Sequence, residues 1–151
     1  MLEELVRQIN SLQRKVDGLI KPEVGRWIDW TPTITQGVGV AITINYSRYI
    51  VDEANKVTVQ ARITATGTGT AGSIIQIGGI PAAVDSKQTG INAVIGTVII
   101  TDSGGVSYHA ALIATSSATW QMLVHNTLNY VGANVTITSG ASISFHATYE
   151  K

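Results

Sequence analysis

The chain has 151 residues, no cysteine and a formal net charge of zero. This length fits one domain of ordinary size together with a short helix. The absence of cysteine excludes a disulfide scaffold and cysteine-based zinc sites. The neutral balance leaves no electrostatic footprint for nucleic acid or for an anionic membrane surface.

The charged residues are unevenly distributed. Nine of the twenty Asp, Glu, Lys and Arg residues fall in 1–26, and the remaining 125 residues carry only eleven. A body so poor in charge and rich in Ile, Val, Thr, Ala and Gly predicts large buried faces. Some of them are expected to be subunit interfaces, since charge is depleted at interface cores. The alternative is a monomeric sandwich with a surface of Thr, Ser and Asn.

The N-terminal segment is patterned as a coiled-coil helix. Apolar residues recur at alternating spacings of three and four, the a and d positions of nearly three heptads. They are Leu2, Leu5, Ile9, Leu12, Val16 and Leu19, and we call them the seam. Because so short a helix is not stable alone, the seam predicts self-association. Residues 1–21 are therefore interpreted as a stalk, and 22–26 as a connector after Gly18 and Pro22 end the helix.

Two opposing signals bear on how many helices associate in the coiled coil. Ile or Val at a with Leu at d favours two strands. Val6 and Ile20 at e widen the apolar stripe, which suits a higher oligomer. We predict a parallel homotrimer; the alternative is a helix that packs back on its own β domain.

From Trp27 onward the spacing changes to strand-like alternation, so 27–151 is predicted to be one β head domain. Eight or nine short strands are expected, separated by Gly, Asn and Asp turns such as 52–55 and 102–105. This pattern predicts a mainly β fold, a jelly-roll-like antiparallel β-sandwich. The expected strands are 38–47, 57–65, 73–80, 94–101, 106–114, 119–124, 133–138 and 141–149.

Enzyme chemistry is not expected. No two of His109, His125 and His146 lie within four residues of each other, so no local metal motif exists. The few acidic residues of the head mostly fall in turns, where they are poor candidates for a paired-carboxylate site. Residues 67–72 match G-x-G-x-x-G but lack a βαβ setting, which excludes a dinucleotide site. We expect no cofactor and no metal.

One cluster is suited to binding a saccharide. Aromatic faces stack on the C–H faces of sugars, while amide side chains pair with hydroxyls. The candidate ligand-binding residues, around a predicted loop at 126–134, are Trp120, His125, Asn126, Asn129 and Tyr130. Trp120 has a competing interpretation as the largest core residue. Trp27 and Trp30 are expected to pack the junction of stalk and head.

Four stretches, in order along the head, resemble the C-terminal head domains of bacteriophage tail fibres and other receptor-binding tail proteins. The first pairs Trp30-Thr-Pro-Thr33 with Tyr46-Ser-Arg-Tyr49; the second is Gly78-Gly-Ile-Pro81. The others are 95–102, a Gly-containing strand closed by Asp, and 140–150, a last strand and terminus. The turn at 52–55 departs from the tighter Gly turn common in such domains.

The resemblance implies a non-enzymatic, trimeric, virion-located module of the phage tail, exposed to the extracellular medium. Its expected partners are its own copies, a host cell-surface saccharide or other receptor, and other tail proteins. Neither nucleic acid nor membrane insertion is expected. Two alternatives stay open: a structural tail or baseplate component without receptor binding, and a cellular trimeric jelly-roll protein ligand.

Overall fold

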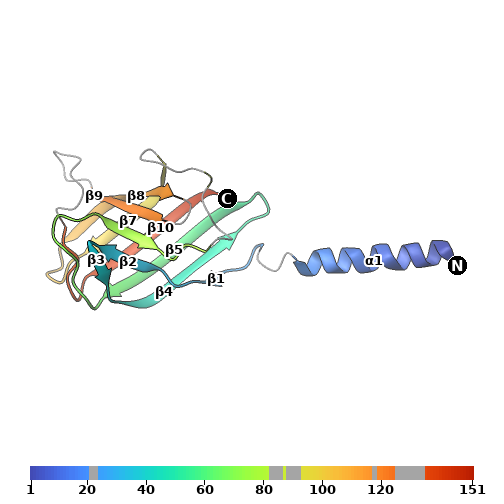
Figure 1. Ribbon diagram of the computed structural model, residues 1–151, viewed down its shortest axis with the longest axis horizontal. Coiled ribbons are helices and arrows are strands. Elements are labelled where there is room, and N and C mark those ends of the chain that lie inside the picture. Colours follow the sequence, from blue (N-terminus) through green and yellow to red (C-terminus); the bar gives the residue numbers. More distant parts are fainter. Residues whose placement is uncertain (21–23, 82–86, 88–92, 117–118, 125–134) are drawn as a thin grey trace.

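The computed structural model describes residues 1–20, 24–81, 87, 93–116, 119–124 and 135–151. It consists of one N-terminal helix and a β body, and the helix extends away from the body (Figure 1). The described residues form one antiparallel sheet of ten strands, in the order β1-β4-β5-β10-β7-β8-β9-β6-β2-β3. The mainly β class and the single helix therefore agree with the sequence prediction.

Helix α1 spans Leu2–Ile20, as the heptad pattern and the helix-ending Gly and Pro predict. Glu3 and Glu4 lie in its first turn, where carboxylates interact favourably with the positive end of the helix dipole. Glu4 also forms an exposed ion pair with Arg7, at 3.4 Å. Such pairs add little stability, so the helix depends on whatever covers its apolar stripe.

The strands are short and alternate between buried and exposed residues. In chain order they are β1 Ile28–Asp29, β2 Thr33–Gln36, β3 Val38–Val40, β4 Ile42–Val51, β5 Lys56–Ala65, β6 Ile75–Gly78, β7 Val94–Thr101, β8 Ser107–Ser116, β9 Thr119–Val124 and β10 Ser142–Glu150.

The sheet is curled, because short connections in the chain join strands that lie near opposite ends of the strand order. β3 and β4 are separated only by Ala41, yet β3 pairs with β2 and β4 pairs with β5. Likewise β1 pairs with β4, and three residues later the chain continues as β2 beside β6. The inward side chains of all these strands consequently share one apolar core.

Two hairpins use the same turn chemistry. Asp52 Oδ1 accepts the backbone N–H groups of Ala54 and Lys56 at 2.9 and 2.8 Å. Asp102 Oδ1 accepts those of Gly104 and Val106, both at 2.9 Å. A residue with positive φ follows in each turn, Asn55 at 58° and Gly105 at 86°, as Asn and Gly permit. Both turns were predicted from these residues.

Asp102 also reaches the adjoining strand. The hydroxyl of Tyr108 donates to Asp102 Oδ2 at 3.3 Å. Burial against the body, and then the charge and hydrogen bond of this carboxylate, raise the pKa of Tyr108 above its ordinary value. The turn and the start of β8 are thereby joined by a side-chain contact as well as by the strand ladder.

The prediction of a strand at 133–138 is wrong for its described part, because 135–138 is not strand. Instead of pairing with a neighbouring strand, the backbone of this segment forms hydrogen bonds with the side chain of Gln36, which is fully buried. Its Nε2 donates to the carbonyls of Val135 and Ser73 at 2.7 and 3.2 Å, and its Oε1 accepts the N–H of Ile137 at 2.9 Å. One amide thus satisfies two buried backbone groups and one part-buried carbonyl.

Replacing Gln36 with leucine is expected to lower the free energy of unfolding by about 2–4 kcal/mol. Each buried donor or acceptor that is left without a partner costs about 1–3 kcal/mol. Denaturant unfolding followed by circular dichroism measures the loss. Gln76→Leu is the matched control, since Gln76 is only half-buried and accepts one long bond of 3.5 Å from Thr35. Equal losses in both variants would contradict the bridging role of Gln36.

Candidate functional site

The seam is uncovered within the single chain. Leu2, Leu5, Ile9 and Leu12 are 76%, 53%, 53% and 60% exposed. The side chains of Val16 and Leu19 lie outside the described part of the chain. Figure 1 shows the helix standing clear of the strands. At these four described positions, the helix therefore does not pack back on its own β body.

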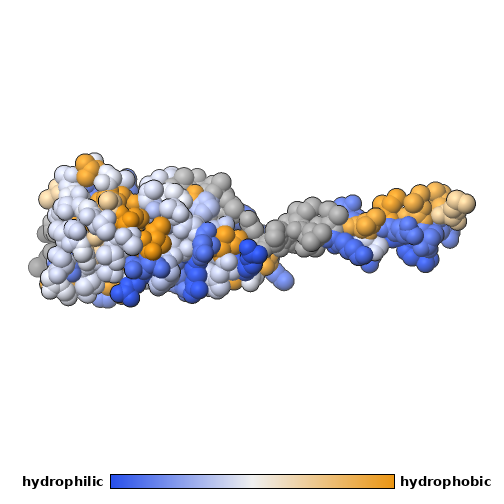
Figure 2. Space-filling model, turned by 90° about the horizontal axis from the view of Figure 1, so that it is seen from below, coloured by the Kyte–Doolittle hydropathy of each residue, from blue (hydrophilic) through white to orange (hydrophobic). Residues whose placement is uncertain are grey.

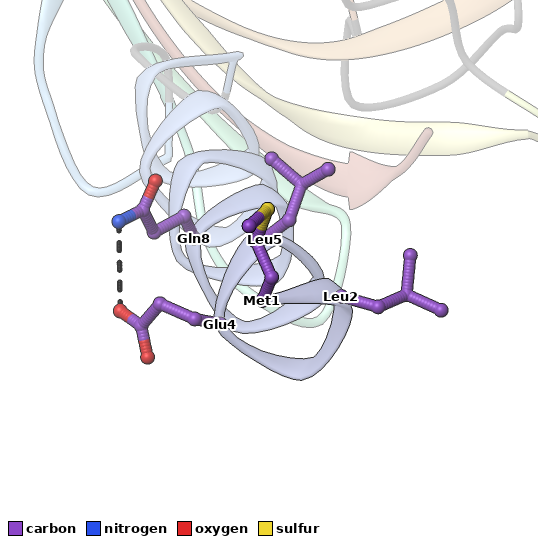
Figure 3. A pocket seen from close by; sticks show the side chains of 5 residues that line it. All are labelled: Met1, Leu2, Glu4, Leu5 and Gln8. Atoms are coloured by element: carbon purple, nitrogen blue, oxygen red, sulfur yellow. Dashed lines mark hydrogen bonds between the residues drawn. The ribbon is translucent and has the colours of Figure 1, made fainter.

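The helix is amphipathic over its described side chains. Figure 2 shows hydrophobic residues along one side of the helix and hydrophilic residues along the other. At the N-terminal end, Leu2 and Leu5 project to one side, while Glu4 and Gln8 project to the other (Figure 3). Gln8 Nε2 donates to Glu4 Oε1 at 3.5 Å on the polar side. The apolar side is thus uncovered at the four described seam positions.

The ligand-binding assignment of Trp120 is corrected by its position. The indole is 0% exposed, so it offers no face to a sugar in solution. Its ring lies edge-on to Trp30, Phe145 and Tyr149, with centroid distances of 6.1, 6.4 and 5.5 Å. Such edge-to-face packing is favoured between aromatic rings. The competing interpretation of Trp120 as the largest core residue fits this environment.

The other four residues of the predicted cluster lie outside the described residues. They are His125, Asn126, Asn129 and Tyr130. Of the residues expected to pack the junction, Trp30 is only 8% exposed and belongs to the aromatic core, whereas Trp27 is 37% exposed. Of the predicted ligand-binding cluster, the described structure therefore places only Trp120.

A different set of side chains forms an open hollow on the body. It lies across four neighbouring strands, β4, β5, β10 and β7, on their outward face. We call it the outer hollow; its lining includes Tyr46, Gln60, Thr97, Ile99, Ser144 and His146. Tyr46 and Ile99 are 47% and 41% exposed, so the hollow joins apolar surface to amide, hydroxyl and imidazole groups.

An arginine is held at the β4 edge of the outer hollow. The guanidinium carbon of Arg48 lies 4.6 Å from the ring centroid of Trp27 and 5.9 Å from that of Tyr46. Its Nη2 donates to Gln60 Oε1 at 3.3 Å. Stacking against aromatic rings limits the freedom of the guanidinium. Among the described residues, Gln60 is the one hydrogen-bond partner given for this side chain, which leaves several of its donors unused there.

Trp27 reaches Arg48 because the chain before β1 follows the edge of β4. Gly25 N–H donates to the carbonyl of Val51 at 2.8 Å, and Val24 forms a parallel bridge with Val51. The predicted connector therefore meets the body at β4. Trp27 thus lies where the connector joins the body, and its ring packs against the guanidinium of Arg48.

The opposite half of the sheet has a different surface. Strands β9, β6, β2 and β3 contain no Asp, Glu, Lys or Arg. Their described outward residues are small or uncharged, such as Thr33, Thr35, Gln76 and Gly78. Val38 on the edge strand β3 is 52% exposed, and Ile74 before β6 is 44% exposed. The body thus has one face with arginine and histidine and one without charge.

The sequence analysis missed the outer hollow. Its residues are spread over 46–146, and the sequence analysis treated them as members of separate strands, not as one group. The register brings them together: Tyr46 pairs with Arg62, Arg62 with Ser144, and Ser144 with Ile99. Only a correct strand order could have found the site, and none of these strands carries a motif.

Neither a cation site nor a membrane span is found in the part of the chain that the structure describes. No three His, Asp or Glu side chains converge there, and no helix is long and apolar enough to cross a bilayer. Comparison with protein-family models, curated proteins and solved structures gives no match. The site must therefore be interpreted from its own residues.

Proposed function

We propose that the chain is a homotrimeric attachment protein that binds a host cell-surface saccharide through its β bodies. The resemblance of the sequence to phage tail-fibre heads supports a place on the virion tail. In this proposal the curled sheet is a jelly-roll-like sandwich, and three parallel copies of α1 form the stalk. Neither enzyme activity nor a cofactor is part of the proposal.

The exposed seam is the observation that carries the proposal. Fully burying a leucine or isoleucine side chain stabilises an assembly by about 1.5–3 kcal/mol. Each chain offers six such positions in register, four of them described as more than half exposed. Within the described residues, a stripe of this kind on a helix clear of the body has no apolar surface packed against it. Parallel copies of the same helix provide one.

The uncharged half of the body supports contact between neighbouring bodies. A stalk of parallel helices places its three bodies side by side. Interface cores are depleted of charged residues, and strands β9, β6, β2 and β3 meet that condition. In the proposed trimer this half faces the neighbouring body, while the outer hollow faces solution.

Three equivalent bodies also give a reason for the stalk. A weak saccharide contact becomes strong when several copies engage one surface, because the later contacts form at high effective concentration. Linked sites can exceed the affinity of one site by about 10²–10⁴. The stalk fixes the direction of the three bodies, so all of them can meet the same cell.

The assembled protein, fluorescently labelled, is expected to bind cells of strains susceptible to the phage that carries it. Mild periodate oxidation of the cells, which destroys vicinal diols of sugars, is expected to abolish the binding. Flow cytometry measures both results, with protease-treated cells as the control for a protein receptor. Absence of binding to every susceptible strain would reject the attachment function and favour a structural tail component.

A further inference from the structure

We propose that the outer hollow is the saccharide site, and that it selects acidic saccharides. The inference rests on the proposed function, since it names the site and the ligand class of the attachment. Its basis is the joining of an exposed aromatic ring, an aromatic-held arginine and a histidine over one open hollow. No residue of the sequence-predicted loop is needed for it.

The register sets the groups in two parallel rows across the sheet. One row carries Arg48, Gln60, His146 and Thr97 on successive strands. The other carries Tyr46, Arg62, Ser144 and Ile99. Each row crosses three inter-strand spacings of about 4.8 Å, or roughly 14 Å in all. This length suits a short oligosaccharide better than a single ring.

Each kind of group matches one part of a sugar. The exposed ring of Tyr46 and the side chain of Ile99 offer apolar surface to C–H faces. Gln60 and Ser144 supply amide and hydroxyl groups for sugar hydroxyls. Arg48, with unused donors, matches a carboxylate or a phosphate, for which the guanidinium fork is the preferred partner.

The charges of this face favour an anion. Arg48 and Arg62 lie on the adjoining strands β4 and β5, and both are exposed. Neither these arginines nor the carboxylates of the same face line the hollow itself. Asp29 on the edge strand β1 lies opposite Arg48 without forming an ion pair, and Glu150 lies at the end of β10. In the described residues Arg48 forms no ion pair. A bound anion would therefore meet guanidinium groups that form no ion pair within the described residues.

A second copy of the chain is a less suitable occupant of this face. Covering it in a subunit contact would desolvate Arg48 and Arg62, across from which the described strands place one carboxylate, Asp29 opposite Arg48, with no ion pair formed. Burying charge that is not compensated is costly. The uncharged half of the sheet offers a contact without that cost. The charge distribution thus favours the uncharged half of the sheet for contact with other copies of the chain, and the outer hollow for the ligand.

The test is a glycan array probed with the whole assembled protein. It carries uronic-acid chains, phosphodiester-linked chains and neutral chains of similar length. The wild-type protein is expected to bind acidic chains in preference to neutral ones; the uronate and phosphodiester arms tell the two sources of negative charge apart. Preference for neutral chains, or binding to none, would overturn the inference.

Two variants locate the site. Arg48→Gln and Tyr46→Ala are each expected to weaken binding about ten-fold or more, as loss of a central contact does. Arg14→Gln on the outer side of the stalk removes the same charge and is expected to bind as the wild type does. Near-UV circular dichroism confirms that each variant is folded. Equal binding by Arg48→Gln and Arg14→Gln would place the saccharide elsewhere, while the attachment function would stand.

Access to the hollow in the assembled protein is tested separately. The chain has no cysteine, so His146→Cys introduces a single thiol in the lining. Rapid labelling by a maleimide is expected. Protection from labelling in the assembly would show that a neighbouring copy covers the hollow, which would overturn the inference. If the protected assembly still bound cells, the proposed attachment function would stand. If the assembled protein bound no susceptible strain, both the attachment function and the assignment of the hollow would be rejected.

Discussion

Replacing Ile9 with glutamate is expected to convert the protein from an assembly of three chains to single chains of 16.0 kDa. Ile9 occupies an a position and is 53% exposed within the chain, so in the proposed stalk three copies meet around the axis. Three carboxylates brought together in an apolar seam would be both desolvated and mutually repelled. Sedimentation equilibrium measures the mass before and after the change.

The matched control for this variant is Asn10→Glu, which places the same new charge one residue later, outside the seam. We expect Asn10→Glu to keep the mass of the unaltered protein. Both variants should retain the β signal in circular dichroism, because the body has its own core. A single-chain mass for the unaltered protein, or an unchanged mass after Ile9→Glu, would contradict the stalk. A mass of two chains would reject the trimer but keep the coiled coil.

Loss of the assembly should also reduce attachment. Single bodies engage a cell through one contact, and the gain from linked sites disappears. Ile9→Glu thereby separates the contribution of one saccharide site from that of three. The stalk and the hollow, which share no residue, are tested by independent variants.

Much of the fold could be predicted from local patterns. The helix follows from a spacing of three and four, and β5, β7 and β9 follow from alternation or apolar runs bounded by turns. The hairpin turns follow from Asp52 and Asp102, whose carboxylates cap backbone N–H groups only a few residues away. These features are decided by neighbours in the sequence, so the sequence reveals them.

Features decided by distant partners could not be predicted. Gln36 and the segment 135–137 lie about a hundred residues apart, and nothing local shows that a side-chain amide will replace a strand ladder. The short strands β1 and β2 were likewise missed, because Pro32 interrupts the alternation between them. Trp30 was assigned to the junction of stalk and head because of its place in the sequence, although it packs in the core.

The candidate site shows the same limit. Residue types alone favoured Trp120 and the predicted loop after it, because aromatic and amide residues are close together in that sequence. The outer hollow depends on strand order, and β10 lies between β5 and β7 although it is last in the chain. Proximity in the sequence pointed to the cluster around Trp120, whereas strand pairing brings together the residues of the outer hollow.

Replacing Trp120 with alanine is expected to cost about 3–5 kcal/mol of unfolding free energy, as large aromatic truncations in cores do. That is a large share of the 5–15 kcal/mol that typically stabilises a domain. The loss would come from the packing of Trp30, Phe145 and Tyr149 around one ring. Denaturant unfolding followed by near-UV circular dichroism measures it.

Two further variants make the Trp120 result specific. Trp120→Phe keeps an aromatic ring and is expected to cost less than alanine, since no described residue accepts a hydrogen bond from the indole N–H. Trp27→Ala removes a tryptophan that is 37% exposed and should change stability little, while freeing Arg48 and weakening saccharide binding. If Trp120→Ala instead kept full stability and lost binding, Trp120 would be a ligand residue and the core assignment would be wrong.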